Sequence, residues 1–165
     1  MNWIFDNNIN TDLITPGRYN ITTDPQELAK ITFIEHRPEF AKNVAKGDFI
    51  IAGNNFGCGS SRETAVTALK TCGIKAIIAK SFARIFYRNC IDQGLLAIVA
   101  PINNIGIDDE LKINIQKQLI VNLSKKIEIS AIIPPLLVKL HREGGIIAYL
   151  KKYGLDSLPK LFIKI

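Results

Sequence analysis

The chain has 165 residues, 47% of them hydrophobic, and a formal net charge of +6 at pH 7. This length suits one domain, 1–165, with a buried core, and no apolar stretch is long enough to cross a membrane. The lysines are scattered singly or in pairs, so the charge does not indicate nucleic-acid binding. Because the first residues also lack a secretion leader, we expect a cytoplasmic protein with an anionic substrate or an acidic partner.

The first elements are a strand, a loop and two short helices. Residues 3–5 favour a strand, and the Asn-rich segment that follows, with a turn at Pro16-Gly17, favours a loop. Asp24 as N-cap, Pro25 at the first helical position and Glu27 in the first turn predict a helix start. A second short helix is expected over 38–44.

Three aliphatic runs bounded by glycine, within 47–53, 74–82 and 94–100, predict buried strands. Helical stretches between them indicate a parallel sheet covered on both faces. The helix within 79–89 is expected to bury Phe82, Ile85 and Phe86 and to expose its arginines, while Lys80 and Ser81 follow a strand and are candidates to line a cleft.

The last third of the chain predicts an antiparallel meander and then helices. Apolar residues alternate with polar ones over 111–129, with Leu119, Val121 and Leu123 as the apolar positions of the middle strand. Helical spacing returns near residue 136, with a break at Gly144-Gly145. No linker or repeat divides the chain.

The cysteines and histidines indicate neither a disulfide framework nor a metal site. Cys58, Cys72 and Cys90 are odd in number and form no Cys-x-x-Cys pair, which favours reduced thiols. His36 and His141 have no partner at metal-ligand spacing, so we expect surface histidines. No metal is assigned to this chain.

The segment GNNFGCGSSRE, Gly53 to Glu63, lies between a predicted strand and a predicted helix. Gly57, Cys58 and Gly59 are expected to form a backbone cradle, and a helix starting at the serines would add free N–H groups for a carboxylate or phosphate. Ser60 and Glu63 also fit a capping box, which would make the serine structural. Arg62 beside a helix start opposes the helix dipole, which favours a ligand-binding role for the segment.

This segment, together with GIKAIIAKSFARIFYRNCIDQGL and the N-terminal NTDLITPGRY, resembles the swivelling domain of the aconitase superfamily, as found in small subunits of 3-isopropylmalate dehydratase. The resemblance covers residues 6–97 and is densest over 47–95. It implies an α/β fold of the swivelling β/β/α type, with a mixed, partly parallel core sheet or barrel flanked by helices. The chain departs from the family pattern at Thr64, where His is usual, and at Cys90 and Asp92, where Ala and Asn are usual.

The resemblance also implies roles for site residues. Ser60 corresponds to the family's base, an alkoxide that removes the α-proton of the substrate, and Arg62 to a residue that binds a substrate carboxylate. An alcohol needs strong electrostatic help to act as a base, which backbone donors and a guanidinium can supply. Ser61 and Arg18 are further candidate substrate ligands, and Ile21 lies in the loop to which the family's substrate choice is attributed.

The implied function is a hydro-lyase, inactive as an isolated subunit, that interconverts 2-isopropylmalate and 3-isopropylmalate in leucine biosynthesis. The implied cofactor is a 4Fe-4S cluster held by a larger partner in a heterodimer or heterotetramer, with a homodimer of the isolated chain left open. Ile21 suits an isopropyl group better than a third carboxylate. Homoaconitase or a dimethylmalate dehydratase remains an alternative, as does a non-enzymatic binding or regulatory module on the same fold.

Overall fold

A four-stranded parallel sheet forms the centre of the computed structural model, which describes residues 1–162. The strand order is β1-β2-β3-β4, so neighbours in the sequence are neighbours in the sheet. The two central strands are buried at every position, as expected for a parallel sheet covered on both faces. The strands are β1 (Asn2–Phe5), β2 (Phe49–Ala52), β3 (Ala76–Ala79) and β4 (Leu96–Val99). The predicted parallel strands are confirmed.

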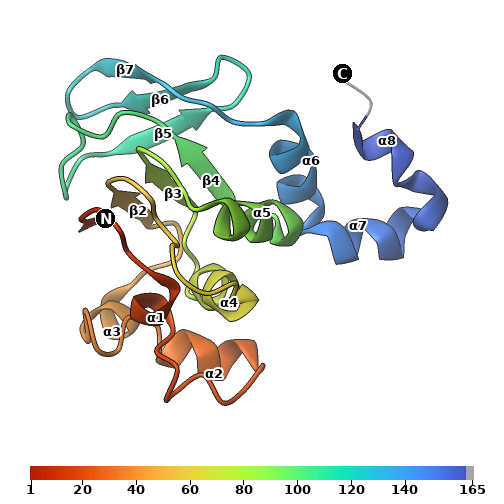
Figure 1. Ribbon diagram of the computed structural model, residues 1–165. Helices are drawn as coiled ribbons and strands as arrows, with labels where there is room; N and C mark the ends of the chain where they lie inside the picture. Colours follow the sequence, from red (N-terminus) through yellow and green to blue (C-terminus); the bar gives the residue numbers. More distant parts are fainter. Residues whose placement is uncertain (163–165) are drawn as a thin grey trace.

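Two hydrophobic cores share this sheet, one on each face. Ile50 and Ile77 point to the face that is covered by helices, where Phe33, Phe40 and Leu69 pack against them. Four of the helices at this face are α1 (Thr11–Ile14), α2 (Pro25–Lys30), α3 (Phe40–Asn43) and α4 (Glu63–Thr71), and a further helix, described below, adds Phe86 and Cys90 to the same core. Figure 1 shows these helices on one side of the parallel sheet and the second sheet on the other. Each such buried side chain contributes about 1.5–3 kcal/mol of hydrophobic free energy.

The opposite face packs against a three-stranded antiparallel sheet made of β5 (Leu111–Asn114), β6 (Leu119–Asn122) and β7 (Ile127–Ser130). The predicted meander is confirmed, and it forms its own sheet, joined to β4 by a bridge between Val99 and Ile132. The expected apolar positions of the middle strand are wrong. Ile120 and Asn122 are fully buried, whereas Leu123 is exposed. Asn122 can lie inside because its side-chain amide donates to Asn104 O at 3.0 Å and Asp109 Oδ2 at 2.7 Å.

The remaining helices complete one end of the molecule. These are α5 (Arg84–Gln93), α6 (Pro135–Glu143), α7 (Ile146–Tyr153), the 3-10 turn η1 (Leu155–Ser157) and α8 (Pro159–Phe162). The predicted break at Gly144-Gly145 is confirmed, since both residues have positive φ between α6 and α7. In α5, Phe86 is buried as expected, but Ile85 is 53% exposed. Within residues 1–162, no helix is long and apolar enough to cross a membrane.

Two segments near the N-terminus refine the predictions. The segment predicted as a loop contains the one-turn helix α1, because Asn10 caps it by accepting a hydrogen bond from Leu13 N at 2.7 Å. Helix α2 begins as predicted, with Asp24 accepting from the N–H groups of Gln26 and Glu27. Helix α1 follows β1, so it lies at the carboxyl end of the parallel strands, where the next loops also lie.

Candidate active site

The loop that follows β2, residues 53–62, is held against two other segments. The Asn54 N–H donates to Asn7 Oδ1 at 2.6 Å, and the Asn55 N–H donates to Ser81 Oγ at 2.8 Å. Short bridges join Asn10 to Cys58 and Phe56 to Phe82. The loops after β1, β2 and β3 are therefore tied together at the carboxyl edge of the sheet, as is typical of ligand sites in open α/β folds.

Gly57 allows the loop to pass closely over α5. Its φ is +78°, and an added Cβ would lie 2.1 Å from Phe86 Cγ, which no side chain could tolerate. The Gly57 N–H donates to Ile9 O at 2.7 Å. This amide is therefore not available as a cradle donor, and the expectation for it is corrected: Gly57 supplies space, while its donor is used to bind the β1 loop.

The helix after the loop begins later than the sequence indicated. Helix α4 starts at Glu63, its N-cap is Arg62, and no side chain caps it. The predicted helix start at the serines and the capping box are therefore both wrong. In the part of the chain described, the amide groups of Gly59, Ser60 and Ser61 donate to no other backbone or side-chain group, so they are available to a ligand. The cradle thus shifts by two residues toward Ser61.

Ser60 lies on the surface of a cavity of about 420 Å³ that is also lined by Asn55, Gly59 and Arg84. The Ser60 hydroxyl lies 3.0 Å from the hydroxyl of Thr11, which is buried. The Thr11 N–H donates to Cys58 O at 2.8 Å, which fixes Thr11 beside the loop. Ser60 is thus exposed to a ligand on one side and supported by a fixed hydroxyl on the other.

Arg62 is oriented by the residue next to Thr11. Its Nη1 donates to Asp12 Oδ1 and, at 3.1 Å, to Thr15 O. A Cβ on Gly17 would lie 3.2 Å from Arg62 Nη2, so the absence of a side chain there leaves room for the guanidinium. The Nη2 and Nε donors make no bond to the described residues, which leaves part of the fork for a carboxylate.

Three site residues were missed by the sequence reasoning. Thr11 and Asp12 belong to the NTD stretch on which the resemblance rested, and that motif was the signal that they hold Ser60 and Arg62. Arg84 was interpreted as a solvated helix residue. It is the first residue of α5, lines the Ser60 cavity, and forms no ion pair with any residue within 1–162. No local pattern distinguishes it from Arg88.

Arg18 and Ile21 line a separate cavity of about 320 Å³ with Tyr19, Thr22 and Glu27. Arg18 Nε forms an ion pair with Glu35 Oε1, and its guanidinium lies 5.0 Å from the centre of the Tyr19 ring. Ile21 is 88% exposed. The structure therefore does not bring this pair into the Ser60 cavity, although Gly17 connects their loop to Arg62.

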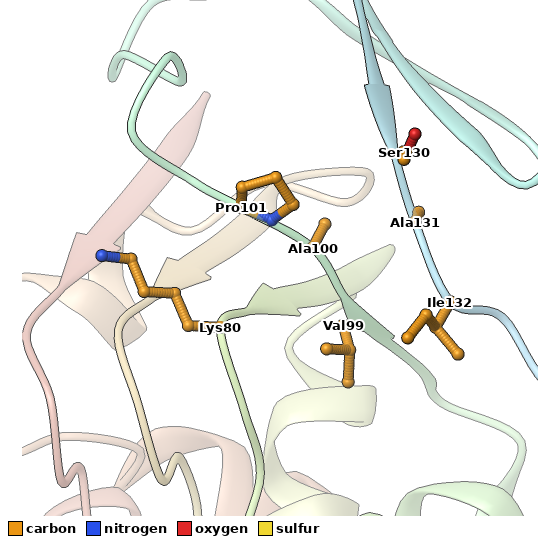
Figure 2. A pocket seen from close by; sticks show the side chains of 7 residues that line it. All are labelled: Lys80, Val99, Ala100, Pro101, Ser130, Ala131 and Ile132. Atoms are coloured by element: carbon orange, nitrogen blue, oxygen red, sulfur yellow. The ribbon is translucent and has the colours of Figure 1, made fainter.

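Lys80 and Ser81 have different positions at the same edge. Ser81 supports the loop through its bond with Asn55. Lys80 borders a cavity of about 420 Å³ between the ends of β4 and β7, which Figure 2 shows, with Val99, Pro101 and Ile132 on its apolar walls. Lys80 therefore does not line the Ser60 cavity.

The cysteines do not fit an iron–sulfur cluster. Among residues 1–162, no three Cys, His, Asp or Glu side chains lie close enough together to hold a metal ion. A cysteine binds a metal as its thiolate, but burial raises the pKa of the Cys72 thiol and of the Cys90 thiol. Cys90 is fully buried, as expected for a residue that replaces alanine.

The Thr64 hydroxyl oxygen is also buried and has no hydrogen-bond partner among the described residues.

Comparisons with known proteins agree with this fold. Residues 2–103 match the family described as Aconitase C-terminal domain. The chain is 49% identical to 3-isopropylmalate dehydratase small subunit 2 of Archaeoglobus fulgidus, over 92% of this chain and 93% of that one. It is also 49% identical to the methanogen homoaconitase small subunit of Methanocaldococcus jannaschii, over 94% and 92%. A crystal structure of 3-isopropylmalate dehydratase from Methanocaldococcus jannaschii superposes with a TM-score of 0.88 at 47% identity, covering 96% of both chains.

Proposed function

The chain belongs to the family of aconitase C-terminal domains, and on this basis we propose that it is the small subunit of a hydro-lyase that interconverts 2-isopropylmalate and 3-isopropylmalate. The observation that carries the proposal is Ser60, whose hydroxyl faces an open cavity beside unpaired backbone N–H groups. This arrangement suits a base that works on a small anionic substrate.

Ser60 is proposed as the group that moves the proton. Its alkoxide takes the α-proton, the electron pair of the C–H bond becomes the new double bond, and the hydroxyl leaves from the neighbouring carbon. Return of the proton from Ser60 to that neighbouring carbon, with hydroxide added to the first carbon, consumes one water equivalent in total, gives the isomer and restores the alkoxide. The unpaired amide groups of Gly59 and Ser61 and the positive charge of Arg62 lie in the same loop as Ser60 and are suited to stabilise negative charge that develops there.

Arg62 is proposed to bind a substrate carboxylate. Its Nη1 is held by Asp12 and Thr15, so the guanidinium plane is fixed before substrate arrives. The remaining donors can form two parallel bonds to one carboxylate, which fixes its orientation as well as its position. Ser61, with an unpaired amide beside Arg62, is proposed to contact the same substrate.

The surroundings of Ile21 favour isopropylmalate over homoaconitate. A third carboxylate needs a cation, but the positive charge of Arg18 already faces the carboxylate of Glu35. The carboxylate of Glu27, in the same cavity, is likewise paired with Lys30 Nζ at 2.6 Å, so neither Arg18 nor Lys30 is a free cation for a third carboxylate. An isopropyl group can instead contact Ile21 and Ile31. Overall identity does not separate the two substrates, since relatives with either name are 49% identical to this chain.

A larger partner is proposed to supply the Lewis acid that the leaving hydroxyl requires, as a 4Fe-4S cluster. The cysteines of this chain do not fit that cluster, so no step is assigned to them. Ile85 at the Ser60 cavity and Ile132 at the neighbouring cavity are 53% and 64% exposed, and such apolar side chains favour contact with a partner over this edge.

The test is anaerobic reconstitution with the cognate large subunit, assayed side by side on 2-isopropylmalate and homoaconitate. We expect turnover of 2-isopropylmalate by the complex and none by the isolated chain. Ser60→Ala should lower kcat by about 10²–10⁴-fold, the usual contribution of a general base. Ser124→Ala, the same change at an exposed serine whose hydroxyl accepts from Glu110 N away from both cavities, serves as the matched control and should keep the kcat of the natural chain.

Two outcomes would contradict this assignment. Turnover of homoaconitate but not of 2-isopropylmalate would assign the other substrate to the same site. A reconstituted complex that keeps full turnover with Ser60→Ala would remove Ser60 as the base and would support a binding or regulatory role for the chain.

A further inference from the structure

Thr11 makes two contacts with Ser60 that compete for one proton. Thr11 Oγ1 lies 3.1 Å from the Ser60 carbonyl oxygen and 3.0 Å from the Ser60 hydroxyl oxygen. A threonine hydroxyl has one hydrogen to donate, so it cannot donate to both. While Ser60 is neutral, Thr11 donates to the carbonyl and accepts from the Ser60 hydroxyl, and both contacts are satisfied.

Loss of the Ser60 proton changes this pattern. An alkoxide has no hydrogen to donate and is a much stronger acceptor than a carbonyl oxygen. Rotation of the Thr11 hydroxyl hydrogen by itself then redirects its bond from the carbonyl to the alkoxide. We propose that Thr11 is a positioning residue that holds the Ser60 base in its ionised form by switching its single hydrogen-bond donor onto it.

The position of Thr11 suits this role. Its side chain is 1% exposed, and a β-branched side chain has a restricted χ1, so the oxygen stays beside Ser60 in both states. Its own N–H is bound to Cys58 O, in the loop that carries Ser60. A donor that is already in place costs no reorganisation when the charge appears, which is the property of effective oxyanion stabilisation.

The charged groups around this pair act in the same direction or are already neutralised. Arg62 and Arg84 bring positive charge to the loop and the cavity. The carboxylate of Asp12, next to Thr11, is paired with Arg62. The Cys58 side chain is half-exposed in the same loop. The contribution of Thr11 is therefore separable from these groups, because it is a short-range hydrogen bond from a neutral hydroxyl.

The inference rests on the proposed role of Ser60, and it predicts an effect on pH dependence as well as on rate. In the reconstituted complex, Thr11→Val should lower kcat/KM at neutral pH by about 10- to 100-fold, the value of one hydrogen bond to a charged group. The acidic limb of the pH profile should move up by about 1–2 pH units, because the Ser60 base then takes up a proton more readily. Thr11→Ser, which keeps the hydroxyl, should restore both.

Thr32→Val is the matched control. Thr32 is also a buried threonine, and its hydroxyl donates to Leu28 O at 3.1 Å, away from Ser60. The Thr32→Val variant should therefore have the pH profile of the natural chain. The position of the acidic limb does not depend on how much enzyme is active, so it decides the question even if Thr11→Val lowers the yield of folded complex.

The proposal is overturned if Thr11→Val keeps the pH profile of the natural chain, or if Thr11→Ser shows the same shift as Thr11→Val. Ser60→Ala, measured in the same preparation, separates the two levels of the argument. One outcome is an active natural complex, an inactive Ser60→Ala complex and a Thr11→Val complex that behaves like the natural one. In that case Thr11 does not hold the Ser60 base in its ionised form, and Ser60 remains the base. If Ser60→Ala is itself fully active, the proposed function fails first.

Discussion

The loops at the carboxyl edge of the parallel sheet differ from the antiparallel sheet behind it in how completely their polar groups are hydrogen-bonded within the chain. In the antiparallel region, Asp109 accepts from Gly106 N at 2.6 Å, Asn122 Nδ2 at 2.7 Å and Lys125 Nζ at 2.9 Å. The Gly106 N–H first, and then the Lys125 and Asn122 bonds, lower the pKa of Asp109 to about 2. Every strong polar group of this cluster is paired within the chain.

The loop after β2 leaves its polar groups incompletely paired. The amides of Gly59, Ser60 and Ser61 have no acceptor among the described residues, and Arg84 has no carboxylate partner there. Unpaired donors beside an open cavity add little to folding but are suited to a ligand. The comparison predicts that substitutions in the loop after β2 alter catalysis, whereas substitutions in the antiparallel region alter stability.

Among the variants that compare the two regions, Arg62→Lys should have the largest effect in the reconstituted complex. One ammonium can replace the bond to Asp12 but cannot also form two parallel bonds to a substrate carboxylate. We expect kcat/KM to fall by about 100-fold, with the free energy of unfolding changed by less than about 0.5 kcal/mol. Arg88→Lys is the control, since Arg88 is 83% exposed and only loosely paired with Asp92. Equal losses in both variants would contradict the separation.

Asn122→Ala should lower stability and leave catalysis unchanged. It removes the amide bonds to Asn104 O and Asp109 and leaves the Lys125 N–H without its acceptor at 3.0 Å. The free energy of unfolding should fall by about 2–3 kcal/mol, measured by urea denaturation. The kcat of the assembled complex should not change. Asn103→Ala, at an exposed position, should change stability by less than about 0.5 kcal/mol. A lowered kcat in Asn122→Ala would show that the two regions are coupled.

The smallest effect concerns pH. Because the folded pKa of Asp109, about 2, lies below its unfolded value near 3.9, its ionisation stabilises the fold above about pH 4, and this contribution is lost as the pH falls toward 2. The Asp109→Asn variant has no carboxylate at this position, so it lacks this stabilisation at every pH. The difference in urea midpoint between the two proteins should therefore shrink from pH 5 to pH 2.5. A constant difference would mean that the charge of Asp109 does not contribute.

The sequence predicted the elements whose structure depends on local pattern. The strands β2 to β4 are continuous aliphatic runs bounded by glycine, and α2 begins at a capping Asp followed by Pro25. The predictions for these elements were therefore correct. The positions that failed depend on distant partners. Asn122 is buried only because Asn104 and Asp109 receive its amide, and alternation alone placed Leu123 inward instead.

The same reasoning explains the site. Ser60 and Arg62 were proposed as site residues from a local motif and the resemblance that it carries, but the start of α4 and the use of the Gly57 amide were not predicted. Gly57 donates to Ile9, forty-eight residues earlier in the chain, which no pattern within the loop encodes. Arg84 enters the cavity because α5 follows β3 at the same edge of the sheet, which requires the topology.

The pairing of two adjacent residues, Thr11 and Asp12, with Ser60 and Arg62 fixes the positions of Ser60 and Arg62 without the segment that comes next. Helix α1 is fastened before the chain reaches Arg18, through the bond from Thr11 N to Cys58 O and through Arg62 to Thr15 O. Residues 18–23 can then vary in length and side chains while the reacting groups stay in register. In the proposed function, the segment that selects the substrate is therefore separate from the residues that transform it, and exchange of this one short surface segment should change specificity without moving Ser60.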